Sequence, residues 1–127
     1  VDLDGVVTKL PEIEEEKISD EERVRAFKIE IQSEEIILIN GKKSDFATIK
    51  KQLKRYLKNN TSESIIILKN DRSTPYMLFI KTQNEMVGAF EEVRNELATQ
   101  KFKRSFDELS QEQQEEIKKT YPMKIVD

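Results

Sequence analysis

Apolar and polar residues alternate along residues 27–32, and this two-residue period predicts a half-buried strand. Residues 36–39 are apolar at every position and predict a second strand. Asn40-Gly41 ends this run with a pair that tolerates the positive φ of a tight turn. The two strands are therefore expected to form a hairpin.

The next segments predict two helices that cross between strands. Apolar residues recur at helical spacing along residues 46–57, after Asp45 or Ser44 as a cap. Residues 64–68 are rich in β-branched side chains and predict a central strand. A long helix is expected over roughly 75–100, with Thr74 as its cap and Pro75 in its first position.

The C-terminal quarter predicts short helices followed by one more strand. Residues 105–108 and 110–113 both have the sequence pattern of a capping box, and the helical material is expected to end near 121–122. Residues 123–126 predict a last short strand. The expected fold is α+β, with about four strands in a small mixed sheet, in the order β-β-α-β-α-(α)-β, and helices mainly on one face.

Residues 1–25 differ from the rest of the chain because their apolar positions follow no sustained period. Seven acids and one lysine give residues 12–22 a net charge of −6, and such a segment repels itself and stays solvated. We therefore expect a flexible acidic stalk over 1–25 and a folded domain over 26–127.

The composition excludes several kinds of chemistry. The 127 residues include no Cys, His or Trp, so the usual zinc, haem and iron–sulfur sites, disulfides and His-dependent nucleophiles are absent. Hydrophobic residues make up 36% and charged residues 37%, and no apolar run approaches the roughly 20 residues of a membrane helix. We expect a non-enzymatic chain that spans no bilayer and has no cofactor, and only carboxylate catalysis stays open.

The charge distribution argues against nucleic-acid binding. The net charge is −3, although seven bases and one acid give residues 42–58 a net charge of +6. No aromatic residue lies among these bases on the polar side to stack on a nucleobase. Docking of the acidic stretch onto this basic helix, within one chain or between two copies, is the more natural hypothesis.

Asp71 and the sheet edges are the candidate sites. An acid at the end of a buried strand is a common ligand or catalytic position, and an enzyme using Asp71 is one hypothesis; the simpler interpretation is that Asp71 accepts hydrogen bonds from loop amides. Short strands also leave unpaired backbone groups at the edges of a sheet, where an extended peptide can add. Residues 123–126 are one candidate edge.

In order and spacing, these elements resemble the ExbD/TolR family of biopolymer transport proteins, from about Leu10 to Val126. The features that carry the resemblance are Leu10-Pro11 after an extended lead-in, the hairpin ending in Ile39-Asn40-Gly41, a strand over 65–68 followed by Asp71 and then Tyr76 at a helix start, Gln83-Asn84-Glu85, and Tyr121-Pro122-Met123-Lys124-Ile125. Residues 101–121 are extra helical material relative to shorter family members.

The resemblance implies a periplasmic domain of a single-pass protein of the bacterial inner membrane, whose membrane helix would precede the acidic stalk. Such a subunit would sit as a homodimer inside an ExbB-like channel protein and couple proton flow to a TonB-like protein for outer-membrane transport. The alternative is a TolR-like module of envelope integrity that contacts peptidoglycan and a TolA-like partner.

The same resemblance nominates partner-binding residues. Leu10 and Pro11 are expected to transmit motion from the membrane helix. Asp71 and Tyr76 are carried over from the family's strand-end pattern. Ile125 and Val126 are expected to pair with an added strand.

Overall fold

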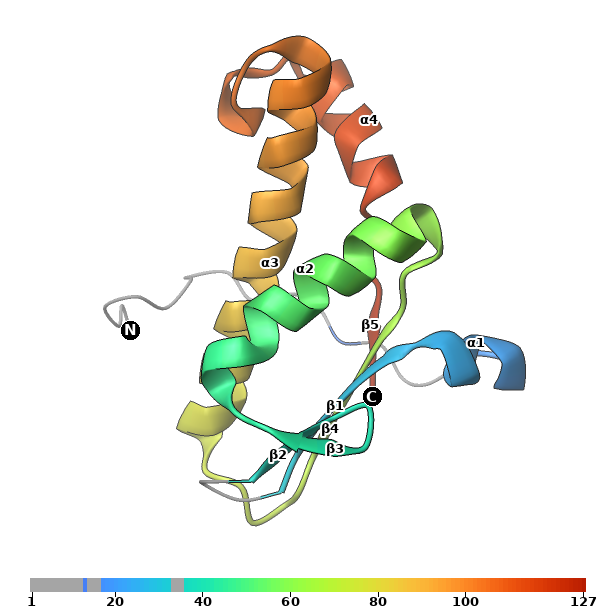
Figure 1. The fold of residues 1–127 in the computed structure, drawn as a ribbon, viewed down its shortest axis with the longest axis vertical. Helices are drawn as coiled ribbons and strands as arrows, with labels where there is room; N and C mark the ends of the chain where they lie inside the picture. Colours follow the sequence, from blue (N-terminus) through green and yellow to red (C-terminus); the bar gives the residue numbers. More distant parts are fainter. Residues whose placement is uncertain (1–12, 14–16, 33–35) are drawn as a thin grey trace.

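The computed structural model describes residues 13, 17–32 and 36–127. Within this part of the chain, helices and one mixed five-stranded sheet form the α+β fold that the sequence predicts (Figure 1). The strands are β1 (Phe27–Ile31), β2 (Ile37–Ile39), β3 (Lys42–Ser44), β4 (Ile66–Asn70) and β5 (Ile125–Val126). The helices are α1 (Asp20–Arg25), α2 (Ile49–Asn60), α3 (Tyr76–Phe102) and α4 (Gln111–Thr120), with 3-10 turns η1 (Phe46–Thr48), η2 (Thr61–Glu63) and η3 (Phe106–Glu108).

The strand order is β3-β2-β1-β4-β5. β1 and β2 form the predicted antiparallel hairpin, and β4 pairs with β1 and β5 in parallel. The fifth strand, β3, was not predicted. Asn40 and Gly41 adopt φ values of 54° and 83°, so they form a two-residue turn that leads β2 into an antiparallel partner instead of ending the sheet.

The main core lies between one face of the sheet and the helices α2 and α3. Alternation places Phe27, Ile29 and Ile31 of β1 on this face, where each side chain is at most 2% exposed. The helices contribute their own apolar stripes, which are Ile49, Leu53 and Leu57 from α2 and Met86, Ala89, Phe90 and Val93 from α3. The prediction that the helices lie mainly on one face is therefore confirmed for this pair.

Among the described residues, the other face of the sheet is covered only at one end. Ala26, Ile65, Ile67 and Val126 form a small cluster there, and the half-buried Ile18 packs against it from the segment before α1. This cover explains why the first three residues of β4, Ile66 to Leu68, are apolar on both faces. β4 lies between β1 and β5, so its predicted interior position is confirmed.

Beyond the sheet, the C-terminal half of α3 and all of α4 project together as a helical arm, which we define as residues 94–121 (Figure 1). Ala98, Leu109 and Ile117 form its own apolar cluster. The predicted capping box at Ser110 is present, with Ser110 Oγ accepting from the Gln113 amide. No such cap forms at Ser105, where the chain makes only the turn η3.

At the point where the arm returns the chain to the sheet, the half-buried Arg94 joins the two segments. Arg94 Nε and Nη2 both donate to the Tyr121 carbonyl, at 3.1 and 2.7 Å. Desolvation lowers the pKa of Arg94, yet the paired donors and the nearby Phe90 ring give the guanidinium favourable contacts. Tyr121 then enters the main core just before β5.

Two local predictions were wrong. No regular element was expected before residue 26, but α1 begins after Ser19, whose hydroxyl oxygen accepts from the Glu22 amide while the Glu22 carboxylate accepts from the Ser19 amide. Thr74 does not cap α3, because its hydroxyl donates to the Ile31 carbonyl and the cap position is Pro75. None of the described helices has the length and apolarity needed to cross a membrane.

Truncating the centre of the core should destabilise the fold strongly. Phe90 is fully buried, so Phe90→Ala is expected to lower the free energy of unfolding by about 3–5 kcal/mol. Met77, on the same helix, is 52% exposed, and Met77→Ala should change it by no more than about 0.5 kcal/mol. Chemical denaturation followed by circular dichroism measures both values, and equal losses would contradict this description of the core.

Candidate functional site

The two-residue strand β5 forms one edge of the sheet. Ile125 is opposite Ile66 and Val126 is opposite Ile67, and no second strand among the described residues pairs with β5. Because the Ile66 amide donates to the Lys124 carbonyl, alternation directs the N–H and C=O of Ile125 away from β4. An added strand would therefore meet the backbone of Ile125.

The side chains of β5 are not available to such a partner. Ile125 is 2% exposed and belongs to the main core, whereas Val126 is 1% exposed and belongs to the cluster on the opposite face. The nomination of these residues for strand pairing thus concerns their backbone, and it stays a prediction.

β4 extends beyond β5 and leaves an open stretch of edge. β5 pairs only with Ile66 and Ile67, so the following residues of β4 have no strand beside them on that side among the described residues. A hollow here is lined by Ile13, Leu68, Lys69, Asn70, Phe79 and Asp127. Ile13 is half-buried and packs against the main core, so the segment before α1 reaches this edge.

Asp71 makes the loop hydrogen bonds that its simpler interpretation expects, and it also lines a hollow with Glu30. Its Oδ1 accepts from the amide and the hydroxyl of Ser73, both at 3.0 Å. The backbone hydrogen bond, followed by that of the hydroxyl, lowers the pKa of Asp71, whereas a general acid at neutral pH needs a raised value. Asp71 is exposed and organises the loop between β4 and α3.

Tyr76 is the first residue of α3 and is 70% exposed. Its ring centroid lies 6.4 Å from that of Phe79, and Met77 beside it is also exposed. No contact joins Tyr76 to Asp71 among the interactions of the described residues, so the two do not form one site. Leu10 and Pro11 lie outside the described residues, and their predicted role is not tested.

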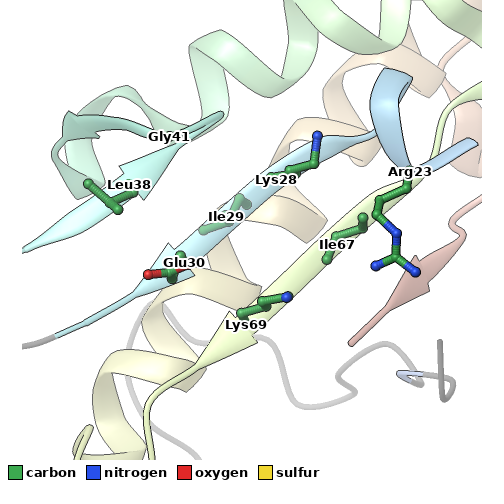
Figure 2. A pocket seen from close by; sticks show the side chains of 8 residues that line it. All are labelled: Arg23, Lys28, Ile29, Glu30, Leu38, Gly41, Ile67 and Lys69. Carbon is green, nitrogen blue, oxygen red and sulfur yellow. The ribbon is translucent and has the colours of Figure 1, made fainter. Parts of the chain in front are cut away.

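The face of the sheet away from α2 and α3 carries a hollow that was not predicted. Figure 2 shows its lining from β1, β2, β4 and α1, with Ile67 and Leu38 as apolar side chains and charged groups around them. The residues that line it are Arg23, Lys28, Ile29, Glu30, Leu38, Gly41, Ile67 and Lys69. Its volume is about 170 Å³.

Strand register explains how these side chains come together. Glu30 is opposite Leu38 on one side and Lys69 on the other, and Leu38 is opposite Lys43. One row across the sheet therefore reads Lys43, Leu38, Glu30, Lys69, all on the same face. Lys28 is opposite Ile67 in the neighbouring row.

The basic helix α2 is partly neutralised by α3. Lys50 and Lys54 contact the Glu92 carboxylate at 2.9 and 3.0 Å, while Lys54 and Lys58 contact that of Glu96 at 2.9 and 2.6 Å. We call these five residues the ion-pair row. Three lysines of the basic run thus already have acidic partners, and most acids of the segment proposed to dock there lie outside the described residues.

The ion-pair row combines two spacings that are visible in the sequence. The three lysines recur every four residues on α2 and the two glutamates are four residues apart on α3, so each set lines one helix face. What the sequence does not contain is the register between two helices about forty residues apart. The described part of the chain holds no group of three or more metal-ligating side chains.

Comparison with known proteins gives one match. A family model described as biopolymer transport protein ExbD/TolR matches residues 3–101. This span includes β1 to β4 and almost all of α3, but it ends before α4 and β5. No curated protein and no solved structure shows a significant match to the chain.

Removing the acids of the ion-pair row should weaken the α2–α3 contact at neutral pH. The pKa of Glu92 is lowered by hydrogen bonds from Lys50 and then Lys54, and the pKa of Glu96 by those from Lys54 and then Lys58. A lowered pKa in the folded state adds stability above the ordinary Glu value, which is lost as the pH falls through the folded value. Because both carboxylates are nearly half exposed, the double variant Glu92→Gln/Glu96→Gln should cost only about 1 kcal/mol.

Urea denaturation as a function of pH measures this effect. The double variant should lose part of the decline in stability that the parent protein shows below pH 4.5. Glu108→Gln/Glu115→Gln changes the charge equally on exposed positions of η3 and α4 and should keep that decline. A difference of similar size in the control would show that net charge, rather than the ion-pair row, is responsible.

Proposed function

The chain belongs to the ExbD/TolR family of biopolymer transport proteins, and we propose that it is the periplasmic domain of an ExbD-like subunit. In this proposal the subunit belongs to a motor of the bacterial inner membrane driven by the proton motive force. The domain couples proton flow through an ExbB-like channel protein to a TonB-like protein, and makes or breaks no covalent bond. The family match over residues 3–101 is the observation that carries the proposal.

The edge strand β5 supports a role in binding another polypeptide. Its side chains are held in the two clusters on either side of the sheet, while the N–H and C=O of Ile125 are directed outward. This arrangement suits the addition of an extended segment by main-chain hydrogen bonds. We therefore assign the TonB-like partner to the β5 edge, with Ile125 and Val126 as the pairing residues.

The proposed division of the chain into two parts follows from its assignment to an ExbD-like subunit. We propose that residues 1–25 are an acidic stalk after a membrane helix, that residues 26–127 are the periplasmic domain, and that the full-length subunit acts as a homodimer. Leu10 and Pro11 would transmit motion from the membrane helix. The helix α1 lies inside the proposed stalk and carries Arg23 to the hollow, while Ile18, just before α1, packs on the sheet. The last part of the stalk is therefore attached to the domain.

Asp71 and Tyr76 have different roles in this proposal. Asp71 shapes the loop that connects β4 to α3, through its hydrogen bonds with Ser73. Tyr76 and Met77 leave apolar surface exposed at the start of α3, next to the end of the β4 edge. Tyr76 is therefore the better candidate for direct contact with a partner.

A TolR-like function is the second candidate, because the matching family model is described for both branches. In that case the domain would contact peptidoglycan and a TolA-like partner and support envelope integrity. Lys51 and Arg55 on the outer side of α2 are exposed and could contact the carboxylates of cell-wall peptides.

Removal of one outward hydrogen-bond donor should distinguish backbone pairing from other modes of binding. Semi-synthesis can place N-methyl-isoleucine at position 125, which keeps the buried side chain and deletes the outward N–H. Titration of the isotope-labelled domain with the periplasmic segment of a TonB-like protein should show affinity reduced about tenfold, because a main-chain bond and the steric fit are lost together.

The control for this experiment is the semi-synthetic protein with ordinary Ile125. Both proteins should unfold at the same temperature, since the N–H of Ile125 does not pair with β4. Equal affinity of the two would contradict binding at the β5 edge. Retention of the parent domain by isolated cell wall, with no binding to the TonB-like segment, would favour the TolR-like function instead.

The coding sequence upstream of Val1 provides a test of the membrane assignment. We expect an apolar helix of about 20 residues with one Asp inside it. Sequencing or assembling the complete gene provides the observation. A complete gene without a bilayer-crossing segment would overturn the motor assignment.

A further inference from the structure

The hollow on the open face of the sheet has an apolar interior and a mainly cationic rim. Ile67 is 2% exposed and Leu38 is half-buried, and together they provide the apolar walls. Arg23, Lys28 and Lys69 contribute three positive charges to the lining and Glu30 one negative charge. A partner side chain inserted here would therefore be apolar. Negative charges on the partner residues that flank it would strengthen binding.

The lysines of this surface have no acidic partner within the part of the chain that the structure describes. Among the described residues, no ion pair joins Lys28, Lys43 or Lys69 to a carboxylate. The Glu30 carboxylate accepts from Gln32 Nε2 at 2.5 Å and does not pair with either lysine beside it. This differs from α2, where the ion-pair row already neutralises three lysines.

The chain itself shows which chemistry this face accepts. Ile18 comes from the acidic stretch 12–22 and packs against Ile65, Ile67 and Val126, at the covered end of the same face. Arg23 from α1 lies beside Ile67 in Figure 2 and lines the hollow. Ile18, an apolar side chain from an acid-rich segment, thus already packs on this face beside the hollow. The hollow offers a second position for a side chain of the same kind.

The size of the hollow limits what can enter. About 170 Å³ is well below the roughly 300 Å³ at which pockets for small-molecule ligands begin. It suits one large aliphatic side chain, and the open surface on either side accommodates an extended backbone with charged flanks. Short segments also gain binding specificity when one buried side chain is surrounded by ion pairs.

From these observations we propose that the open face of the sheet binds an extended segment of a partner protein in which an aliphatic residue is flanked by acids. The aliphatic side chain enters the hollow between Leu38 and Ile67. The flanking carboxylates pair with Lys28, Lys69 and the adjacent Lys43. This site is separate from the β5 edge and does not depend on the assignment of that edge to a TonB-like partner.

The probe for this site is a short synthetic peptide with one central leucine between pairs of glutamates. Titration of the ¹⁵N-labelled chain should shift the amide signals of Lys28, Glu30, Leu38 and Ile67. Replacing the leucine by serine, or the glutamates by glutamines, should weaken binding in each case, and replacing the glutamates by lysines should abolish it. Salt should also weaken binding of the parent peptide, because its ion pairs are exposed.

Charge reversal on the protein gives the matched comparison. Lys28→Glu/Lys69→Glu should reduce the affinity for the acidic peptide at least about tenfold. Arg104→Glu/Lys119→Glu makes the same charge change on exposed positions of the helical arm and should reduce it by less than about threefold, since the charges lie far from the hollow. Circular dichroism and the thermal midpoint verify that both variants are folded.

The outcomes separate the proposal from its alternatives. If the two double variants lose the same amount of affinity for the acidic peptide, net charge alone explains the effect and the proposal is overturned. Shifts confined to α2 or to β5 would do so as well. If sedimentation shows that the parent chain dimerises, and that both the peptide and Lys28→Glu/Lys69→Glu dissociate the dimer, the occupant is a second copy and the partner assignment fails. N-methylation at Ile125 should leave peptide binding unchanged, so failure at the β5 edge and failure here are distinguishable.

Discussion

The fold depends on burial of a single face of the sheet. Phe27, Ile29 and Ile31 alternate along β1, and the stripes of α2 and α3 cover them completely. Because both helices lie on that side, the described residues place no comparable helical layer on the opposite face. Its apolar residues are covered at one end by the segment before α1 and are left in a charged hollow at the other. The surfaces available to partners are therefore a consequence of where the core was placed.

Elements with a strong local period could be predicted from the sequence, and those that depend on tertiary context could not. The alternation along β1 and the helical spacing along α2 and α3 gave the right element types. β3 was missed because its residues, Lys42–Ser44, include no apolar side chain and so show no strand period, although lysines are common on exposed edge strands. The hollow and the ion-pair row were missed because both depend on register between segments distant in the sequence.

The helix starts show that a capping pattern in the sequence does not always produce a cap. Ser19 and Ser110 both begin helices with reciprocal capping boxes, whereas Ser105 has the same sequence pattern and makes no cap. At Ser105 the chain has just left α3 and must turn back, and the Glu108 amide donates to the Ser105 carbonyl and not to its hydroxyl. The segment is therefore a single 3-10 turn, and the Phe106 amide ties it to α3 by donating to Asn95 Oδ1.

The helical arm has a mechanical consequence for the edge strand. β5 contains only two residues, and the chain before it is fastened to α3 at the Tyr121 carbonyl by Arg94. A load applied to the C-terminal strand would be shared between this fastening, the pairing of β5 with β4 and the two buried side chains of β5. Because small cooperative units can open separately from the rest of a domain, β5 and the arm are expected to detach together while β1, β2 and β4 stay paired. The half-buried guanidinium of Arg94 thus couples the edge strand to the arm.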